Sequence, residues 1–485
     1  MNILYVASEA APYVKSGGLG DVAGALPPEL CKIKGNNVSV FLPYYKKIKD
    51  NPTFDIEYVT HFYMPLAWRS MYVGVFKTVI KNTGRGKNKR EDLTYYFIDN
   101  EYYFGRDGLY GYPDDGERFA FFSKAVLEAA EHLNIQCDII HANDWQTGFL
   151  PLFLKAHYNN VDCVKNAKTV FTIHNIEYQG KADPEFLTEV LGVDEGWRNV
   201  CTFDKLINAL KCALVLSDKI TTVSDTYAHE LKYAFFANGL EQILSENEYK
   251  TCGIVNGIDT KLYNAETDPA IVSNFKASDL SGKAICKESL QKELGLPQNP
   301  DVPIVAMISR LVNHKGLELV NYMANELGNM NIQFVVLGTG DKQYEDMFKF
   351  MEYCHPDKVR ALIMFDAKLA NRIYSGADFL LMPSKSEPCG LSQLIAMRYG
   401  TIPIVRETGG LVDTVPPINP QTLEGRGFTF KVFNAHDMLG AVQRAASFFF
   451  NKEKLNAFRS AIMRYDSSWR EPAQKYYALY KEIAQ

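Results

Sequence analysis

The segment from Met382 to Val415 constrains the fold of this chain most strongly, because it contains two strand-to-helix turns in close succession. A mostly apolar run from Ala377 to Met382 is typical of a buried strand, and it leads into P-S-K-S-E-P-C-G-L-S-Q. A second apolar run, from Thr401 to Val405, leads into R-E-T-G-G. Two such turns favour neighbouring strands of a parallel α/β sheet, in which ligands bind beyond the carboxyl ends of the strands.

These two turns are expected to bind a phosphorylated, hydroxyl-rich ligand. Backbone N–H groups at the start of a helix lack intrahelical partners and attract anions, above all phosphates. Glu387 lies in the first turn, where a carboxylate would repel a phosphate. Glu387 is therefore better suited to accept hydrogen bonds from a neutral part of the ligand, such as sugar hydroxyls.

The alternation of apolar strands with helical segments continues along the whole chain and predicts two doubly wound parallel sheets. A length of 485 residues also requires more than one domain. We expect an N-terminal domain over residues 1–240 and a C-terminal domain over residues 241–462. A last helix within residues 463–485 is expected to pack back on the first domain. Residues 55–98 alternate apolar and polar positions, which indicates β-hairpins in or beside the first domain.

Composition excludes several classes of protein. A net charge of −5 and a pI of about 6.1 argue against a nucleic-acid-binding protein, and the basic run at residues 81–90 is more simply a solvated hairpin tip. Nine scattered cysteines without a C-x-x-C pair indicate a reducing compartment and no zinc ribbon. The first residues lack the pattern of a signal peptide, and no apolar run has the length of a membrane span. We expect a cytoplasmic protein, without a metal site and without a Ser-His-Asp nucleophile.

A glycine-rich loop follows the first expected strand, with Lys15 before Gly17, Gly18 and Gly20. A glycine turn before a helix can hold an anion, and Lys15 would add a positive charge. A turn with a solvent-exposed lysine explains these residues equally well. The spacing differs from G-x-G-x-x-G, which disfavours a dinucleotide-binding oxidoreductase.

Arg310 and Lys315 follow another expected core strand at short spacing. The planar fork of an arginine and the compact charge of a lysine together suit a diphosphate. A pair of solvated cations is the alternative, and the place at the end of a core strand favours the functional interpretation.

Other polar and aromatic residues stand at the ends of expected strands. His174 and Asn175 end one strand, and a catalytic role and a structural role are about equally supported there. Asp144 and Trp145 follow another strand and suit a sugar, although Trp145 could also belong to the core. Phe365 could stack on a base or could be a core residue.

Seven motifs in their order along the chain closely resemble those of bacterial glycogen synthases and plant starch synthases. They cover the chain from about Asn2 to Val415, and the first and last are the most specific. The motifs are K-S-G-G-L-G-D-V, H-A-N-D-W, T-I-H-N-I-E-Y-Q-G, V-N-G-I-D, S-R-L-V-N-H-K-G, P-S-K-S-E-P-C-G-L-S-Q and R-E-T-G-G-L-V-D-T-V.

The resemblance implies the GT-B fold, in which two Rossmann-like domains face a deep cleft. It implies transfer of glucose from ADP-glucose to the 4-hydroxyl at the nonreducing end of an α-1,4-glucan, with retention of configuration and without a cofactor. Arg310 and Lys315 would then hold the diphosphate, Glu387 would bind glucose hydroxyls, and His174 would lie against the reacting sugar. Further donor-binding residues would be Lys15, Gly18, Asp21, Asn256, Phe365, Cys389, Gly390, Leu391 and Ser392. Acceptor-binding residues would be Asp144, Trp145 and Asn175.

Some positions depart from the family pattern. Gln146 stands where many relatives have His, and Ser386 stands where an aromatic residue is common. Phe365 replaces a frequent Tyr, and Ile395 replaces the second Glu of the wider retaining GT-B pattern. These differences leave the preferences for acceptor and nucleotide open.

The same residues bear on three alternatives to an ADP-glucose-dependent synthase. A UDP-glucose-dependent transferase is disfavoured by K-S-G-G-L, and a glycogen phosphorylase by the lack of a pyridoxal phosphate lysine segment. A non-catalytic glucan-binding scaffold would be marked by loss of at least one of four residues, yet all four are present: Lys15, Arg310, Lys315 and Glu387. The sequence indicates no oligomeric state, and a plastid location would apply only to a processed mature chain.

Overall fold

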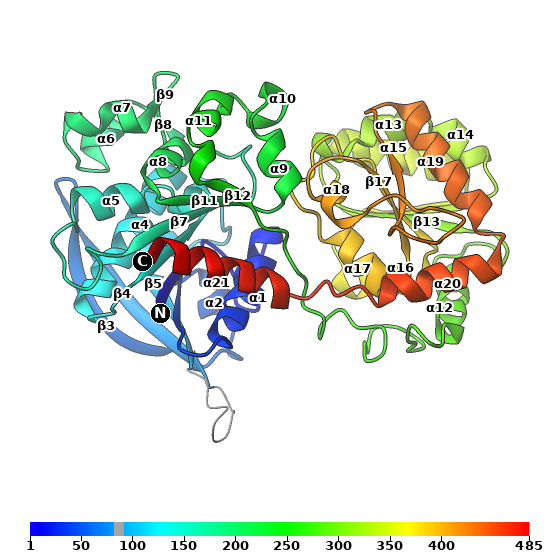
Figure 1. The fold of residues 1–485 in the computed structure, drawn as a ribbon, viewed down its shortest axis with the longest axis horizontal. Coiled ribbons are helices and arrows are strands. Elements are labelled where there is room, and N and C mark those ends of the chain that lie inside the picture. The colour runs from blue at the N-terminus through cyan, green and yellow to red at the C-terminus, as the bar shows by residue number, and fades with distance from the viewer. Residues whose placement is uncertain (82–91, 485) are drawn as a thin grey trace. The chain divides into compact units, whose positions relative to one another are not determined.

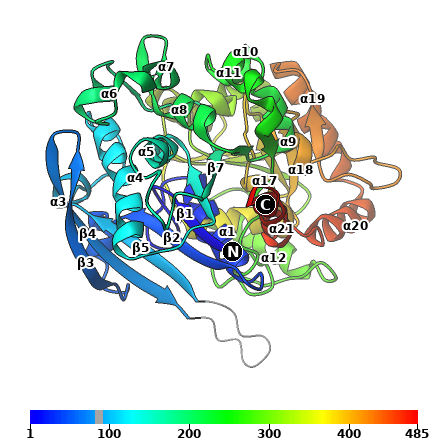
Figure 2. The ribbon, with the colours of Figure 1, turned by 60° about the vertical axis from the view of Figure 1, so that its left-hand side comes forward.

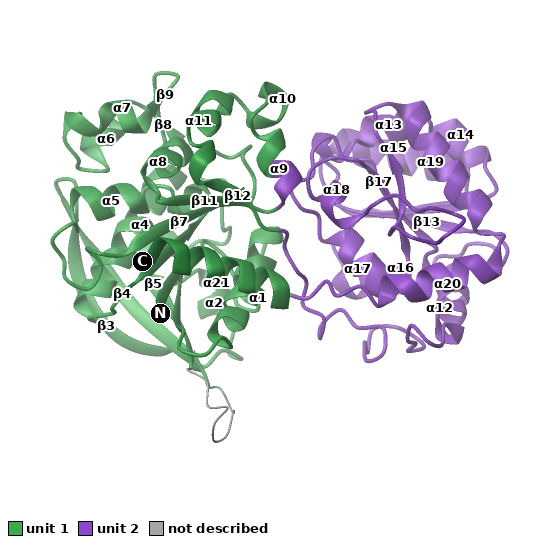
Figure 3. Cartoon of the chain, viewed as in Figure 1, with its two compact units in different colours: residues 1–223, 228–254, 469–485 green, residues 224–227, 255–468 purple. Residues whose placement is uncertain are grey.

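Figure 1 shows the chain in a computed structural model, which describes residues 1–81 and 92–484. The chain divides into two units, coloured separately in Figure 3. Unit 1 comprises residues 1–223, 228–254 and 469–485, and unit 2 comprises residues 224–227 and 255–468. Apart from Lys81, the hairpin tip expected at residues 81–90 lies outside the described residues.

Unit 1 is built on a nine-stranded sheet in the order β12-β11-β7-β6-β1-β2-β5-β4-β3. The strands from β12 to β5 are parallel, whereas β4 and β3 extend the sheet as an antiparallel hairpin, in agreement with the alternating pattern of residues 55–98. The strands are β1 (Asn2–Val6), β2 (Asn37–Pro43), β3 (Glu57–Leu66), β4 (Arg69–Ile80), β5 (Leu93–Asp99), β6 (Ile139–Asn143), β7 (Lys168–Ile173), β11 (Lys219–Thr222) and β12 (Thr251–Gly253).

Helices cover both faces of the parallel part of this sheet, which explains why its strands are continuous apolar runs. The longer helices are α1 (Gly18–Cys31), α4 (Asp115–His132), α5 (Leu150–Ala156), α8 (Ala209–Leu216) and α21 (Arg470–Ala484). Shorter ones are α2 (Lys46–Lys49), α3 (Glu101–Phe104), α6 (Phe186–Glu189), α7 (Arg198–Cys201), α10 (Ala234–Ala237) and α11 (Glu241–Glu246). The helix α9 (Asp225–Glu230) begins in unit 2 and ends in unit 1. A small separate sheet contains β8 (Lys181–Ala182), β10 (Leu206–Asn208) and β9 (Thr202–Phe203).

The C-terminal helix α21 belongs to unit 1, where it lies beside α1 (Figures 1 and 2). Tyr480 of α21 is fully buried, and its hydroxyl lies 2.6 Å from Nδ1 of His141 in β6. The ring of Tyr476 lies 5.4 Å from the His141 ring, between centroids. The end of the chain therefore helps to hold the strand that leads into Asp144.

The change of unit falls between Ile254 and Val255, whereas the sequence pattern placed it after residue 240. The reason is that β12 pairs in parallel with β11 and so completes the sheet of unit 1. The last change falls between Ser468 and Trp469, where the chain returns to unit 1.

Unit 2 contains a six-stranded parallel sheet in the order β15-β14-β13-β16-β17-β18. Its strands are β13 (Ile304–Ile308), β14 (Gln333–Leu337), β15 (Val359–Leu362), β16 (Phe379–Met382), β17 (Ile402–Arg406) and β18 (Phe428–Phe430). Its helices are α12 (Ser281–Glu293), α13 (Leu317–Tyr322), α14 (Ala324–Asn329), α15 (Lys342–Cys354), α16 (Ala367–Gly376), α17 (Ser392–Arg398), α18 (Gly410–Thr414), α19 (Ala435–Phe448) and α20 (Lys452–Met463). Two separate hydrophobic cores, one in each unit, accompany the two sheets.

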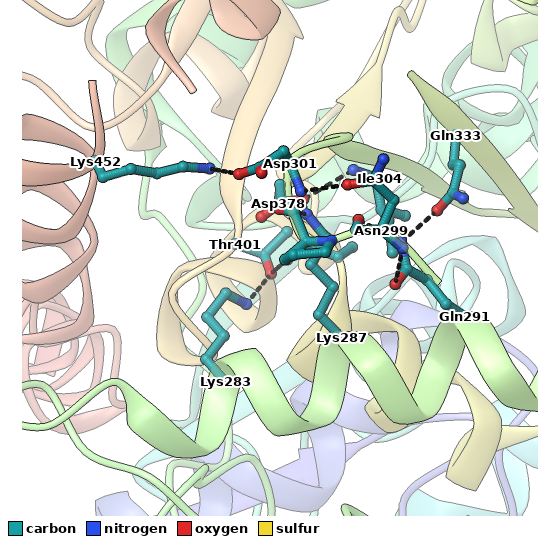
Figure 4. A network of polar contacts seen from close by, with 12 residues as sticks. Lys283, Lys287, Gln291, Asn299, Asp301, Ile304, Gln333, Asp378, Thr401 and Lys452 are labelled. Carbon is teal, nitrogen blue, oxygen red and sulfur yellow. Dashed lines mark hydrogen bonds and ion pairs between the residues drawn. The ribbon is translucent and has the colours of Figure 1, made fainter. Parts of the chain in front are cut away.

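A buried polar network lies at the amino ends of the strands of unit 2 (Figure 4). Asp378, next to the start of β16, accepts the backbone N–H of Ile304 at 2.8 Å and pairs with Lys287 at 2.9 Å and with Arg459. Lys283 donates to Oγ1 of Thr401 and to the carbonyl oxygen of Tyr399, both at 2.8 Å. The network ties α12 and α20 to the sheet, at the edge opposite to the carboxyl ends of the strands.

Candidate active site

The first turn of the 382–415 segment brings a buried carboxylate to the carboxyl edge of the sheet of unit 2. Oε2 of Glu387 lies 2.6 Å from Nζ of Lys315 and accepts the hydroxyl of Ser384 at 2.9 Å. Glu387 is only 6% exposed, and its burial opposes ionisation, but the charge and hydrogen bonds of Lys315 and Ser384 still hold the pKa of Glu387 below its ordinary value. Glu387 is therefore ionised and fixed in orientation, which suits an acceptor of hydroxyl groups.

The two strand-to-helix turns are packed directly against each other. The backbone N–H of Gly410, at the start of α18, donates to the carbonyl oxygen of Glu387 at 3.0 Å, and a Cβ on Gly410 would lie 2.4 Å from Cα of Cys389. Gly390 has φ +73°, and the amide of Gln393 holds its carbonyl oxygen at 2.8 Å. The segment Cys389–Ser392 is thus a tight turn into α17, with Leu391 at the N-cap and no side-chain cap on the backbone N–H groups.

Other predicted residues of unit 2 follow neighbouring strands. Arg310 comes after β13 and is exposed, and its side chain has no ion pair or hydrogen bond among the described residues. Phe365 lies three residues beyond β15, which ends at Leu362, and is 86% exposed. The expected strand end at Phe365 is therefore wrong, and its ring is free to stack rather than being part of the core.

Asn256 is buried, and its Oδ1 is enclosed without a hydrogen-bond partner among the described residues. Its backbone forms a hydrogen bond with the thiol of Cys389, whose pKa burial raises to about 12. Cys389 therefore stays protonated and has a packing role rather than the role of a nucleophile.

In unit 1, the side chain of Asp144 fastens the turn that carries His174. Asp144 follows β6 with φ +56°, a conformation that is uncommon for a residue other than glycine. Its Oδ1 accepts the backbone N–H of His174 at 2.7 Å and that of Asn175 at 3.3 Å. Burial raises the pKa of Asp144 to about 7 in spite of these two donors.

Trp145 is partly buried at the edge of the core of unit 1 rather than standing free. Its ring meets Phe119 edge to face, with 5.3 Å between centroids, and a Cβ on Gly180 would lie 2.3 Å from the indole Cε3. The sequence left open whether Trp145 binds a sugar or belongs to the core. In the structure Trp145 belongs at least partly to the core.

The glycine-rich loop of unit 1 is held by a carboxylate that the sequence analysis did not single out. Glu9 is 2% exposed and accepts the backbone N–H of Ser16 at 2.6 Å and that of Gly20 at 3.2 Å. Lys15 pairs with Asp21 at 2.6 Å, and both side chains are partly exposed. Gly18 begins α1 directly after this loop. Lys15, Gly18 and Asp21 therefore form one cluster, with Glu9 beneath it.

Two further residues missed from the sequence contact predicted site residues directly, Ser384 at Glu387 and Asn143 at His174, and Tyr5 contacts Asn143 in turn. Ser384 and Asn143 lie inside motifs already recognised. Their short polar side chains within those motifs were the signal that the sequence offered. Tyr5 offered no such signal, because it reads as an ordinary residue of an apolar strand.

The described residues contain no group of three His, Cys, Asp or Glu side chains that could hold a metal ion. Within the same residues, no helix is long and apolar enough to cross a membrane.

Changing Asp144 to Asn is expected to remove a pH dependence of stability. A carboxyl group whose pKa is raised by folding, here to about 7, binds more protons in the folded state, so stability falls as pH rises from the unfolded pKa towards pH 7. At about 1.4 kcal/mol per pKa unit, this loss is roughly 4 kcal/mol. Asn keeps an oxygen for the N–H of His174 but does not ionise.

Urea unfolding between pH 4 and pH 8 measures this effect, and the wild type should lose stability relative to Asp144→Asn over this range. The matched control is Asp138→Asn, an exposed residue that accepts the backbone N–H of Asn2. A constant difference between wild type and Asp144→Asn across the range would contradict the raised pKa.

Comparison with known proteins matches both halves of the chain. The model described as starch synthase catalytic domain matches residues 2–246, and the one described as glycosyl transferases group 1 matches residues 288–458. Two Rossmann-like units, each with polar groups beyond the carboxyl ends of a parallel sheet, define a glycosyltransferase of the GT-B class.

Curated relatives extend over the full length. The glycogen synthase of Desulforamulus reducens is 46% identical and covers 100% of this chain and 99% of its own length. The glycogen synthase of Ligilactobacillus salivarius is 44% identical, with 100% of each chain covered. The protein therefore belongs to the glycogen synthase and starch synthase family, as its motifs predicted.

Solved structures agree. The catalytic domain of starch synthase IV from Arabidopsis thaliana, bound to ADP and acarbose, matches with a TM-score of 0.89 and 33% identity over 99% of both chains. Sucrose-phosphate synthase from Thermosynechococcus elongatus matches with a TM-score of 0.61 at 19% identity over 99% of this chain and 98% of that one, which shows the fold alone.

Proposed function

We propose that this protein transfers glucose from ADP-glucose to the nonreducing-end 4-hydroxyl of an α-1,4-glucan, with retention of configuration. The observation that carries the proposal is the ion pair between the partly exposed Lys315 and the buried Glu387 at the carboxyl edge of unit 2, in a chain of this family. A carboxylate for hydroxyls and a cation for phosphates, 2.6 Å apart, match a ligand that joins a sugar to a diphosphate. The match to a starch synthase bound to ADP supports an adenine nucleotide.

In this proposal the residues of unit 2 act on the donor. Arg310 and Lys315 hold the diphosphate and stabilise the negative charge that develops as ADP leaves. Glu387 accepts hydrogen bonds from glucose hydroxyls. Asn256, whose backbone is hydrogen-bonded to Cys389, also contributes to binding the donor. Phe365 stacks on the base, and the turn Cys389–Ser392 offers its backbone N–H groups to the phosphates.

Residues of unit 1 act on the sugar and the acceptor. His174 lies against the reacting glucose, and Asp144 keeps the His174–Asn175 turn in place through its two backbone hydrogen bonds. Trp145 lines the acceptor side. Lys15, Gly18 and Asp21 contribute to the donor from the loop that Glu9 holds.

The reaction needs no enzymic nucleophile. The bond between the anomeric carbon and the phosphate oxygen breaks and leaves an oxocarbenium-like centre and ADP. The acceptor oxygen then forms its bond on the same face, and its proton passes to the leaving phosphate oxygen. This route gives retention without the second carboxylate on which retaining glycosidases depend.

Incorporation of labelled glucose into glycogen tests the proposal, with ADP-glucose and UDP-glucose as parallel donors and Glu387→Ala as the inactive control. We expect incorporation from ADP-glucose, abolished in the variant, unaffected by a chelator, and released by an enzyme specific for α-1,4 linkages. Incorporation from UDP-glucose alone would keep the fold and mechanism and overturn the donor. Failure with both donors by a folded protein that still binds glycogen would favour a glucan-binding scaffold.

A further inference from the structure

The side-chain amide of Asn143 has only one possible orientation. Asn143 is the last residue of β6 and is fully buried. Its Nδ2 faces two carbonyl oxygens, that of Val6 at 3.0 Å and that of His141 at 3.4 Å. A carbonyl oxygen accepts and never donates, so the atom next to it must be the NH₂ group. The opposite atom, which faces the other way, is therefore the oxygen Oδ1.

Two groups approach this oxygen. The hydroxyl of Tyr5 in β1 donates to Oδ1 at 3.0 Å, and Nε2 of His174 lies 2.9 Å from the same atom. Burial raises the pKa of Tyr5 well above its ordinary value, so its hydroxyl keeps its proton. Because Oδ1 can only accept, Nε2 of His174 must carry a proton.

The imidazole of His174 is neutral at physiological pH. Burial lowers its pKa to about 3. The neighbouring His141 is neutral as well, because burial and then the proximity of His174 lower its pKa to about 3. A neutral imidazole carries one proton only, so Nδ1 of His174 has a free lone pair. None of the described residues forms a hydrogen bond with Nδ1.

We propose that Asn143 is a positioning residue, which holds the ring of His174 as the tautomer with its proton on Nε2 and so presents Nδ1 as an acceptor for a hydroxyl of the transferred sugar. The assignment of the sugar rests on the proposed function, whereas the tautomer rests on hydrogen bonds within unit 1. Asp144 holds the backbone of His174 and Asn143 holds its ring, so two consecutive residues at the end of the same strand fix one histidine.

The tautomer is measured directly by ¹⁵N NMR of protein with labelled histidine, without any substrate. The nine histidines are resolved by comparison with His174→Gln, whose spectrum lacks the signal of interest. In the wild type we expect a protonated, pyrrole-type signal from Nε2 of His174 and an unprotonated, pyridine-type signal from Nδ1, both unchanged across neutral pH.

Three variants separate the role of Asn143 from a merely structural one. Asn143→Ala removes the acceptor, and we expect a mixture of both tautomers. Asn143→Asp keeps an acceptor but adds negative charge, and we expect the pKa of His174 to rise. Tyr5→Phe is the matched control, because it removes the other donor to Oδ1 and should leave the tautomer of His174 unchanged.

Kinetics supply the second measurement. We expect Asn143→Ala to lower kcat about tenfold, the equivalent of one hydrogen bond, with a smaller change in KM. We expect Asn143→Asp to introduce a new ionisation into the pH profile of kcat, and Tyr5→Phe to stay within about threefold of the wild type.

A proton on Nδ1 in the wild type, or an unchanged tautomer in Asn143→Ala, would overturn the proposal. If Asn143→Ala does not fold, the titration of His174 in Asn143→Asp decides, and an unshifted pKa would overturn it. A correct tautomer in a protein without glucosyl transfer would contradict the proposed function but leave the role of Asn143 in place.

Discussion

Replacing Arg310 by Ala is expected to lower kcat about 100- to 1,000-fold, the usual cost of removing one preorganised group that stabilises charge in a transition state. Arg310 follows β13 at the carboxyl edge of unit 2, the edge where Lys315 and Glu387 pair. It is exposed, and its side chain makes no ion pair or hydrogen bond with any described residue, so its guanidinium remains available for the proposed diphosphate. For the same reason its removal should not change stability.

The rate of glucose transfer and the thermal unfolding midpoint should be measured together. Arg464→Ala is the matched control, because Arg464 is also exposed on unit 2 and its side chain makes no hydrogen bond with a described residue. Arg310→Lys should recover part of the rate, since a lysine keeps the charge but loses the planar fork. An Arg310→Ala protein as active as Arg464→Ala would remove Arg310 from the donor site.

Lys315→Ala is expected to differ from Arg310→Ala in stability as well as in rate. Lys315 is the ion-pair partner of the buried Glu387. Its removal leaves that carboxylate without its cation, which is destabilising in a buried site. The comparison explains why Arg310 is the cleaner test of the leaving-group role.

Changing Asp378 to Asn is expected to reduce the stability of unit 2 by about 3–5 kcal/mol. Asp378 is 2% exposed and pairs with both Lys287 and Arg459, while it also accepts the backbone N–H of Ile304 (Figure 4). An asparagine has nearly the same shape but no charge. Two cationic side chains would therefore remain in the interior without a counter-ion.

The pH dependence of this effect has a definite sign. Burial opposes ionisation of Asp378, but Arg459 and Lys287 outweigh it and hold its pKa below the ordinary value. A carboxyl group with a lowered folded pKa stabilises the protein above its unfolded pKa and loses this contribution as pH falls. The difference between wild type and Asp378→Asn should therefore be full at neutral pH and shrink below about pH 4.

Urea unfolding measures the loss, and hydrogen exchange of β13 and β16 shows whether unit 2 is the part that opens. Asp301→Asn is the matched control, because Asp301 belongs to the same network but its side chain is 77% exposed and lies 3.8 Å from Lys452. That change should cost less than about 0.5 kcal/mol. Equal losses in the two variants would mean that the buried pairs contribute nothing beyond a surface contact.

The sequence alone predicted the GT-B fold, the family and the hexosyltransferase class, and the comparisons confirm all three. Local patterns predicted the two doubly wound sheets, because a buried strand, a glycine turn and a helix start each depend on a few consecutive residues. The GT-B fold, the family and the transferase class followed from the resemblance of seven motifs to a known family. The roles assigned to individual site residues stay predictions. Even so, the sequence placed Lys315 and Glu387 in one ligand site, and they lie 2.6 Å apart.

Only the tertiary structure decided which distant residues meet. The pairing of β12 with β11 moves the boundary between the units to Ile254, and the contact of Tyr480 with His141 fixes how α21, already expected on the first domain, packs on unit 1. Asn143 meets Tyr5 and His174 because β1, β6 and β7 are neighbours in the sheet, although the three residues are far apart in the chain. Strand order and helix packing arise from burial of the whole core, which no short motif encodes, and they determine where each polar side chain finds its hydrogen-bond partner.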